Sequence, residues 1–542
     1  MKTIDQLAGL FPRESDIPED VRILSPIHQR AVLTNGEMRT WKGPTRPVRS
    51  PVRVRNDKGD LVPVELGSIP FTGTGEADAA ISAAGEAWAN GRGLWPTLSV
   101  AERIACVQNF TNQLLARRRE IVNLLMWEIG KSLADSQKEF DRTIEYIRAT
   151  VEELKRLDNS NSRFEIVEGT IAQTRRAPLG IVLCLGPYNY PLNETFTTLI
   201  PAIIMGNVVL FKPPRFGVLL YYPMLEAFRS AFPPGVINIV YGDGNVVMPH
   251  IMASGKVNVL ALIGSSKAAD QMKKAHPKTN RLRAVLGLEA KNAAIVLPDA
   301  DIELAVRECI TGSLSFNGQR CTAIKIILVH QSIADQFLRR FSEEIGKLPI
   351  GMPWEKDVLL TPLPELEKVA YMNKCIEDAK ANGAKVINAG GGNSVETLFY
   401  PALLFPVTEG MKLYREEQFG PVIPVTPFED IETALDYVIT SNHGQQVSIF
   451  GNDPDQIASL VDPLVNQVCR VNINCQCQRG PDVFPFTGRK DSAEGTLSVH
   501  DALRSFSIRS MVATKQTESN KKLLDSIVLG NKSNFITTHF IL

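Results

Sequence analysis

The chain has 542 residues, a length that corresponds to roughly three or four domains. Hydrophobic residues make up 44% and charged residues 22%, which is typical of globular proteins and excludes disordered, collagen-like and disulfide-framework chains. The 59 basic and 59 acidic side chains balance, so a globally basic nucleic-acid binder is excluded, while a local basic pocket for a small anion is not.

The compartment can also be predicted. Residues 1–20 hold several acids and no apolar core, so we expect no secretory signal, and no run of about 18 apolar residues predicts a membrane span. The eight cysteines have no framework spacing, which favours a reducing compartment. Cys475 and Cys477 lack a second ligand pair and are expected to be two thiols on one strand. We therefore expect a cytoplasmic protein with no nucleic-acid, membrane or metal partner.

The first part of the chain predicts strands and then helices. Asn35-Gly36 and residues 57–60 are turn signals between short strands. The basic run over 46–55 favours a solvated edge strand over a phosphate patch. Residues 76–155 are expected to be helical, with Arg142 on the face opposite an apolar stripe. Alternating residues over 163–180 predict a strand.

The middle of the chain changes to short apolar runs separated by helical segments. The runs cover 181–187, 207–214, 236–242, 257–264 and 283–288. Buried parallel strands with helical crossovers have this pattern, so we predict a doubly wound α/β fold with ligands beyond the carboxyl ends of its strands. The pattern resumes after residue 291 and predicts a second α/β unit, and residues 513–542 carry no recognised motif. Neither a G-x-G-x-x-G nor a P-loop fingerprint is present.

Two residues are candidates for covalent chemistry. Cys321 follows a predicted helix and adjoins Arg320, and a neighbouring cation or helix end can lower a thiol pKa. Taken alone, a buried inert cysteine explains Cys321 better. The seven histidines stand in no recognisable catalytic context, so a reactive Cys321 is expected to act without a histidine base. Asn189 lies just past a strand end and either donates to an oxyanion or is an ordinary turn residue.

Two features at strand ends suit the phosphates of a dinucleotide. Lys212 and Arg215 follow one strand, and Gly264 and Ser265, with Ser266, follow another at the start of a helix. The free N–H groups of a helix N-terminus favour phosphate, although a serine cap alone explains the second feature equally well.

Several motifs together resemble the aldehyde dehydrogenase superfamily over about residues 30–515. They are P-x-N-Y-P at 187–191, Lys212, G-Q-R-C-T-A around Cys321 and E-E-Q-F-G-P at 416–421. The text of residues 472–492 and the S-x-N-G-Q-R-C form of the cysteine motif most resemble the non-phosphorylating, NADP-dependent glyceraldehyde-3-phosphate dehydrogenases.

This resemblance implies a role for each matching residue. Cys321 would attack the aldehyde, and the Asn189 amide and the Cys321 N–H would hold the oxyanion. NADP would be bound by Lys212, Arg215, Gly264, Ser265, Glu417 and Phe419. The substrate phosphate would be surrounded by Arg142, Tyr190, Arg320 and Arg479, since guanidinium groups suit a dianion.

One position departs from the family pattern. The family's general base is the glutamate of E-L-G-G-K, and Gly287 stands at that place in the text GLEAKN. Glu289, two residues later, is our candidate for the base. The alternatives are a relative that transfers the acyl group to coenzyme A, an aldehyde dehydrogenase of another aldehyde, and a catalytically silent structural relative.

The resemblance also implies domains built from separated segments. Residues 1–156 and 179–286 would form the cofactor domain and 287–489 the catalytic domain. Residues 157–178 and 490–512 would form an oligomerisation β-arm, followed by the tail 513–542. An exposed alternating strand seeks a partner edge, so a homodimer or homotetramer is expected.

Overall fold

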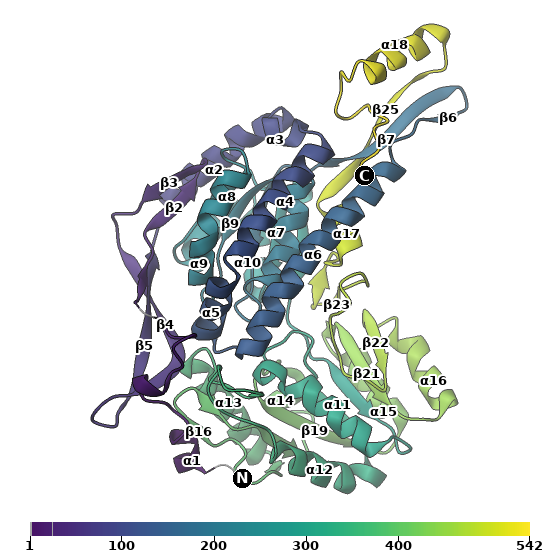
Figure 1. Cartoon of the computed structure of the whole chain (residues 1–542). Helices are drawn as coiled ribbons and strands as arrows, with labels where there is room; N and C mark the ends of the chain where they lie inside the picture. The colour runs from purple at the N-terminus through teal and green to yellow at the C-terminus, as the bar shows by residue number, and fades with distance from the viewer. Residues whose placement is uncertain (1–2, 24) are drawn as a thin grey trace.

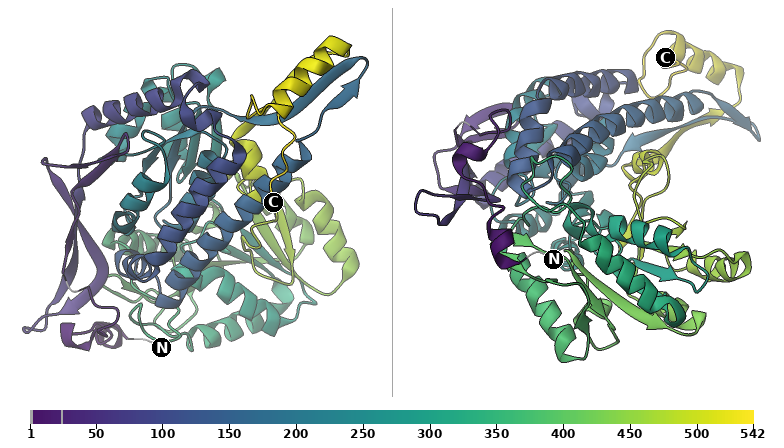
Figure 2. Two further views of the ribbon diagram at one scale, coloured as in Figure 1. Left: turned by 45° about the horizontal axis from the view of Figure 1, so that its top comes forward. Right: turned by 60° about the horizontal axis from the view of Figure 1, so that its bottom comes forward.

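Two open, mostly parallel sheets organise the chain, and helices cover them (Figure 1). The computed structural model describes residues 3–23 and 25–542. The two sheets lie in separate parts of the molecule, and both views in Figure 2 show this separation. No helix in the described part of the chain is long and apolar enough to cross a bilayer.

The first sheet contains the five apolar runs of the middle of the chain. Its parallel strands are β8 (Ile181–Leu185), β9 (Val208–Lys212), β10 (Ile237–Ile239), β11 (Val259–Ile263) and β12 (Arg283–Gly287). Their order is β10-β9-β8-β11-β12, and β24 (Ala493–Glu494) adds an antiparallel edge. The doubly wound prediction is confirmed, because nearly every residue of these strands is buried and both faces need cover.

Helices on both faces bury this sheet. One face packs against α2 (Thr74–Trp88), α9 (Gly244–Ala253) and α10 (Ser266–Ala275). The other packs against a layer that includes α4 (Val100–Ala116), α6 (Leu133–Ser160), α7 (Asn193–Ile204) and α8 (Leu225–Ala231). The carboxyl ends of β8, β9 and β11 therefore remain open as a ligand edge.

The second sheet has the order β15-β18-β19-β14-β13-β21-β22. Its parallel strands are β13 (Ala293–Val296), β14 (Ile326–His330), β18 (Ala402–Phe405), β19 (Val422–Phe428), β21 (Gln446–Phe450) and β22 (Arg470–Ile473), and β15 (Lys385–Val386) is antiparallel. Its helices are α11 (Ile302–Leu314), α12 (Gln331–Ile345), α13 (Leu366–Ala381), α15 (Ile431–Thr440) and α16 (Pro454–Leu464). The second predicted α/β unit is thus present. The prediction that Cys475 and Cys477 share a strand is wrong, because β22 ends at Ile473.

The N-terminal strands border both sheets. β2 (Ala31–Thr34) and β3 (Glu37–Thr40) form a hairpin in which Asn35 has φ 54° and Gly36 has φ 72°, as the Asn-Gly signal predicts. β4 (Thr45–Arg55) lies at the edge of its sheet beside β5 (Leu61–Pro70), and its last residue, Arg55, also forms one isolated bridge with Arg13. α5 (Arg118–Ile129) and α6 then complete the predicted helical region.

A three-stranded antiparallel ribbon projects away from the two sheets (Figures 1 and 2). It consists of β6 (Glu165–Val167), β7 (Thr170–Pro178) and β25 (Ser507–Lys515). It starts later than the arm expected at 157–178, because α6 continues to Ser160, and it ends later than residue 512. Residues 499–505, expected in the arm, form the helix α17 (Val499–Ser505).

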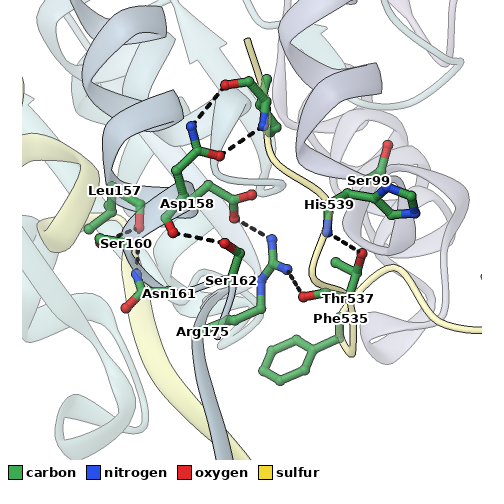
Figure 3. A network of polar contacts seen from close by, with 12 residues as sticks. Ser99, Leu157, Asp158, Ser160, Asn161, Ser162, Arg175, Phe535, Thr537 and His539 are labelled. Atoms are coloured by element: carbon green, nitrogen blue, oxygen red, sulfur yellow. Dashed lines mark hydrogen bonds and ion pairs between the residues drawn. The ribbon is translucent and has the colours of Figure 1, made fainter. Parts of the chain in front are cut away.

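The C-terminal tail folds back onto the base of this ribbon. After α18 (Glu518–Leu529), the Asn159 side chain and the backbone of Ile541 exchange two hydrogen bonds of 2.8 Å. Arg175 lies between Asp158, with which it forms an ion pair, and the Thr537 carbonyl, to which it donates at 3.3 Å (Figure 3). A segment without a recognised motif is therefore fixed by polar contacts to α6 and β7.

Candidate active site

Cys321 follows a tight turn at the end of α11. The 3₁₀ turn over Ser315–Gly318 places Phe316, Asn317 and Gly318 at φ values of 49°, 55° and 70°. This left-handed backbone is costly for the first two residues and persists only where the surroundings hold it. Asn317 supplies that support: its amide donates to the Thr361 carbonyl at 3.0 Å, and its oxygen accepts from the Thr361 N–H at 3.0 Å.

The Cys321 backbone is fixed from two sides. Its carbonyl accepts from the Asn292 amide at 2.8 Å and from the Lys325 ammonium at 2.9 Å. Burial raises the pKa of the Cys321 thiol, and Glu417 acts in the same direction. Lys325, a hydrogen bond with Gln445 and Arg320 oppose this rise without cancelling it. The thiol is therefore mostly protonated at neutral pH and must lose its proton to react.

Asn189 lies beside this turn, as the sequence motif requires. Its side-chain amide donates to the Gln319 carbonyl at 2.8 Å, two residues before Cys321, and the residue is buried. Asn189 and Cys321 line the same cavity, and the Asn189 amide has a second hydrogen that could donate to an oxyanion there.

A buried ion pair anchors the Asn189 loop. Lys131 and Glu139 are both fully buried and pair with each other. Lys131 donates to the Asn189 carbonyl at 2.8 Å, and Glu139 accepts from the N–H groups of Leu192 and Asn193 at 3.0 and 3.1 Å. The Lys131 ammonium also lies 3.5 Å from the centre of the Tyr190 ring and 4.5 Å from that of Phe316. One pair thus connects the start of α6, the oxyanion loop and the cysteine turn.

The four residues proposed to bind the substrate phosphate line one cavity with Cys321. Its volume is about 340 Å³, and Arg142, Tyr190, Arg320 and Arg479 lie in its wall. In the structure these arginines have protein partners. Arg142 forms two hydrogen bonds with Asp482 at 2.9 and 2.7 Å, and Arg479 pairs with Glu194 and, at 3.3 Å, with Asp482.

Arg320 is the least neutralised of the three. It donates to the carbonyls of Thr311 and Gly312 at 3.1 and 2.8 Å, and its Nε is buried without a hydrogen-bond partner among the described residues. Burial works to raise the pKa of Asp482, but Arg142 and Arg479 hold it below its ordinary value. The cavity is therefore a charged one in which a small anion would compete with two carboxylates for the guanidinium groups.

A second, larger cavity reaches Cys321 from the open edge of the first sheet. Its volume is about 880 Å³, and its wall includes Gly264, Ser265, Glu289, Glu417 and Phe419. Ser265 caps α10, because its hydroxyl accepts from the Ala268 N–H at 3.2 Å. Glu417 pairs with Lys325 at 3.1 Å and accepts from the Ala290 N–H at 3.1 Å.

Glu289 lies in this wall but is bound to a helix end. One of its carboxylate oxygens accepts from the Ser266 N–H at 2.8 Å, the first backbone donor of α10. A carboxylate at a helix N-terminus is stabilised by that end of the helix dipole. The same donors would serve a phosphate group, so Glu289 and a bound phosphate would share this end of α10.

Lys212 and Arg215 line an adjoining cavity of about 390 Å³ beyond the ends of β8 and β9. Burial lowers the pKa of Lys212 to about 8, and Arg46 contributes to this lowering. Arg215 pairs with Glu365 at 3.6 Å. Lys212, Arg215 and Arg46 form a cationic group that fits the phosphates of a dinucleotide, with α10 as a further anion site.

Sequence reasoning missed several residues of this region. Lys131, Glu139, Lys325 and His443 carry no motif that the sequence analysis used, and Arg46 was placed in an edge strand without a ligand role. The signal for Arg46 was present in the basic run over 46–55. The Lys131–Glu139 pair had only a weak signal in the sequence, because a lysine and a glutamate eight positions apart do not indicate that both are buried and paired.

The fold and this arrangement of side chains agree with one enzyme family. The chain belongs to the aldehyde dehydrogenase family, whose model matches residues 63–512.

Individual relatives match over most of the chain. The NADP-dependent glyceraldehyde-3-phosphate dehydrogenase of Streptococcus equinus is 35% identical over 465 residues, which cover 84% of this chain and 93% of that protein. The enzyme of the same name from Pisum sativum is 31% identical over 79% of this chain and 84% of its own length. Among solved structures, that of the Bacillus halodurans C-125 enzyme of this name, complexed with NADP, has a TM-score of 0.82 at 32% identity and covers 91% of this chain and 100% of its own. The lactaldehyde dehydrogenase of Escherichia coli has a TM-score of 0.81 at 25% identity and covers the same two shares.

The buried ion pair predicts a large effect of Lys131→Met. The substitution leaves the Glu139 carboxylate buried without its cation, which should lower the free energy of unfolding by about 3–5 kcal/mol. Urea unfolding followed by circular dichroism measures this loss. The double variant Lys131→Met/Glu139→Leu removes both charges and should recover much of the stability. A single variant as stable as the parent protein would contradict the role of the pair.

Proposed function

We propose that the protein oxidises glyceraldehyde 3-phosphate to 3-phosphoglycerate with NADP and without inorganic phosphate. The observation that carries the proposal is the position of Cys321 between two cavities. The three arginines lie in the wall of one, and the open strand edge with α10 lies in the wall of the other. The relatives named for this reaction, and the NADP complex of one of them, support it.

The acylation step uses groups on both sides of Cys321. The Cys321 thiol loses its proton to solvent, and its sulfur attacks the aldehyde carbon to form a thiohemiacetal. The Asn189 amide and the Cys321 N–H hold the oxyanion. Bound NADP supplies the acceptor for the hydride, which leaves a thioester on Cys321. Lys325 holds the Cys321 carbonyl and Glu417 during this step. Water then hydrolyses the thioester to the acid.

The cofactor residues are proposed from the chemistry of the 390 Å³ and 880 Å³ cavities. Lys212 and Arg215 suit the 2′-phosphate of NADP, and Gly264 and Ser265 at the start of α10 suit the pyrophosphate. Glu417 and Phe419 would contact the nicotinamide half of the cofactor. The match to relatives named NADP-dependent supports this choice over NAD.

The alternatives have less support. Transfer of the acyl group to coenzyme A would account for Gly287 in place of the family glutamate, and a silent relative would account for it too. The names of the relatives and the retention of both Cys321 and Asn189 favour the hydrolytic enzyme.

Self-association through the ribbon is also part of the proposal, because its strands expose Ile166, Val167 and Met511.

Removal of one guanidinium tests the phosphate cavity. Arg142→Gln should raise the KM for glyceraldehyde 3-phosphate about 10- to 100-fold, because a charge-assisted hydrogen bond to phosphate is lost. Turnover of glyceraldehyde, which has no phosphate, should change little. Arg148→Gln on the exposed side of the same helix is the matched control. An equal loss with both substrates would contradict a phosphate role for Arg142.

The lowered pKa of Lys212 predicts a pH-dependent affinity for NADP. Above pH 8 the free lysine loses its proton and with it the attraction to the 2′-phosphate, so the Kd for NADP should rise by up to about tenfold per pH unit. The Kd for NAD, which lacks that phosphate, should change less over the same range. Fluorescence titration from pH 7 to pH 9.5 measures both constants.

The control for this measurement is a pair of lysine variants. Lys212→Met should weaken NADP binding and abolish its pH dependence, while Lys256→Met, at an exposed lysine, should bind as the parent does. The same pH dependence in the Lys212→Met protein would rule out Lys212 as its source.

A further inference from the structure

Hydrolysis of the thioester needs a group that takes a proton from water, and the position of the family glutamate is occupied by Gly287. Within the proposed function, we infer that His443 is this general base. The imidazole ring lies in the wall of the 880 Å³ cavity together with Cys321, Gly287 and Glu289. The inference rests on that geometry and on the hydrogen bonds and ion pair that the neighbouring carboxylates already form.

The backbone brings His443 beside the vacated position. Gly287 pairs with Ala493, and His443 pairs with Lys490, so one short segment borders both residues. Ser492 within this segment connects the two sides directly. Its carbonyl accepts from the Leu288 N–H at 2.9 Å, and its hydroxyl accepts from the Gly444 N–H at 3.1 Å. The residues that follow Gly287 and His443 are thus bonded to the same residue.

His443 also shares its electrostatic surroundings with the thiol. Lys325 and Glu417 act on the pKa of both groups. Two residues further along the chain, Gln445 forms a hydrogen bond that acts on the Cys321 thiol. His443 and Cys321 line the same cavity, and the proposal is that a water molecule lies there between the imidazole ring and an acyl group on Cys321.

The imidazole is in a state that can accept a proton. Its Nδ1 is buried from solvent and has no hydrogen-bond partner within residues 3–23 and 25–542, so a proton taken from a water molecule in the cavity must go to Nε2. Burial lowers the pKa of His443 below its ordinary value, against the effects of Glu417, Glu289 and Asp491 and with a smaller lowering by Lys325. Arg489 and Lys490 on the paired strand are the other nearby charges, and the Lys490 ammonium is held by the carbonyls of residues 438, 439 and 441. The ring is therefore neutral at pH 7.

Glu289 and Glu417, which lie in the same cavity wall as Cys321 and His443, already have hydrogen-bond partners. Glu289 accepts the first backbone N–H of α10, and Glu417 is held by Lys325 and the Ala290 N–H. Both instead lie where they stabilise the imidazolium that forms when His443 takes a proton.

The chemical step balances without a further reactant. His443 takes a proton from water, and the water oxygen forms a bond to the thioester carbon. The C–S bond then breaks, its electron pair returns to the Cys321 sulfur, and the proton on the imidazole is released to solvent. The products are the carboxylic acid and the free enzyme, with no change of oxidation state in this step.

Stopped-flow kinetics with NADP and glyceraldehyde 3-phosphate separate this role from the proposed oxidation. The His443→Gln enzyme should show an NADPH burst of about one per active site, because acylation does not need the base. Its steady-state rate should fall at least about 100-fold. In the parent enzyme the hydrolysis rate should rise with pH through a pKa below the ordinary histidine value, and His443→Gln should lose this rise.

Two further variants sharpen the test. His250→Gln, at a partly exposed histidine on α9 that pairs with Asp78, is the matched control and should turn over as the parent does. Gly287→Glu in the His443→Gln background should restore hydrolysis. A Cβ at Gly287 can be accommodated, since it would meet Ile263 at 3.5 Å and Leu497 at 3.7 Å, which are ordinary contacts.

The outcomes are distinguishable. A burst followed by slow turnover in His443→Gln, with the pH dependence lost, supports the histidine base. Unchanged turnover in His443→Gln, or loss of hydrolysis in Glu289→Gln alone, overturns it while leaving the oxidation intact. Absence of any NADPH formation by the parent enzyme would overturn the proposed oxidation and the histidine role with it.

Discussion

The site depends on one ion pair that is closed off from solvent. Lys131 and Glu139 lie eight positions apart at the start of α6, and neither has any exposed side-chain surface. Such a pair is stabilising only when hydrogen bonds satisfy both partners. Here Lys131 donates to the Asn189 carbonyl, and Glu139 accepts from the N–H groups of Leu192 and Asn193. The Phe316 ring lies beside the ammonium group. The buried pair therefore contacts both the Asn189 loop and the turn that precedes Cys321.

Several charged groups of the cavities are already partnered within the chain. Arg142 and Arg479 bind Asp482, Arg215 binds Glu365, and the N-terminus of α10 binds Glu289. Zero net charge over the whole chain is thus compatible with arginines and lysines gathered at the two proposed phosphate sites. A phosphate that enters would compete with these carboxylates for the arginines and the helix end. Such competition lowers the affinity for phosphate, while the carboxylates keep the cationic side chains in place when the site is empty.

Much of this architecture follows from local sequence. The five apolar runs of the first sheet, the Asn35-Gly36 hairpin and the edge position of β4 could be predicted, because burial on both faces and turn chemistry are local properties. Cys321 and Asn189 were found through motifs, and the structure brings them together. The bounds of the ribbon, the docking of the tail on Asn159 and the Lys131–Glu139 pair depend on contacts between distant segments. The position of His443 beside Gly287 could not be predicted, because the segment around Ser492 that borders both residues is distant from each of them in sequence.

The most direct measurement of the central claim is the fate of water oxygen in the product. The purified protein is incubated with glyceraldehyde 3-phosphate and NADP in ¹⁸O-labelled water, without inorganic phosphate or coenzyme A, and the product is analysed by mass spectrometry. The account predicts one 3-phosphoglycerate for each NADPH, with ¹⁸O from water in its carboxylate. NADPH formation that stops after one turnover until coenzyme A is added would contradict it, as would the absence of any 3-phosphoglycerate.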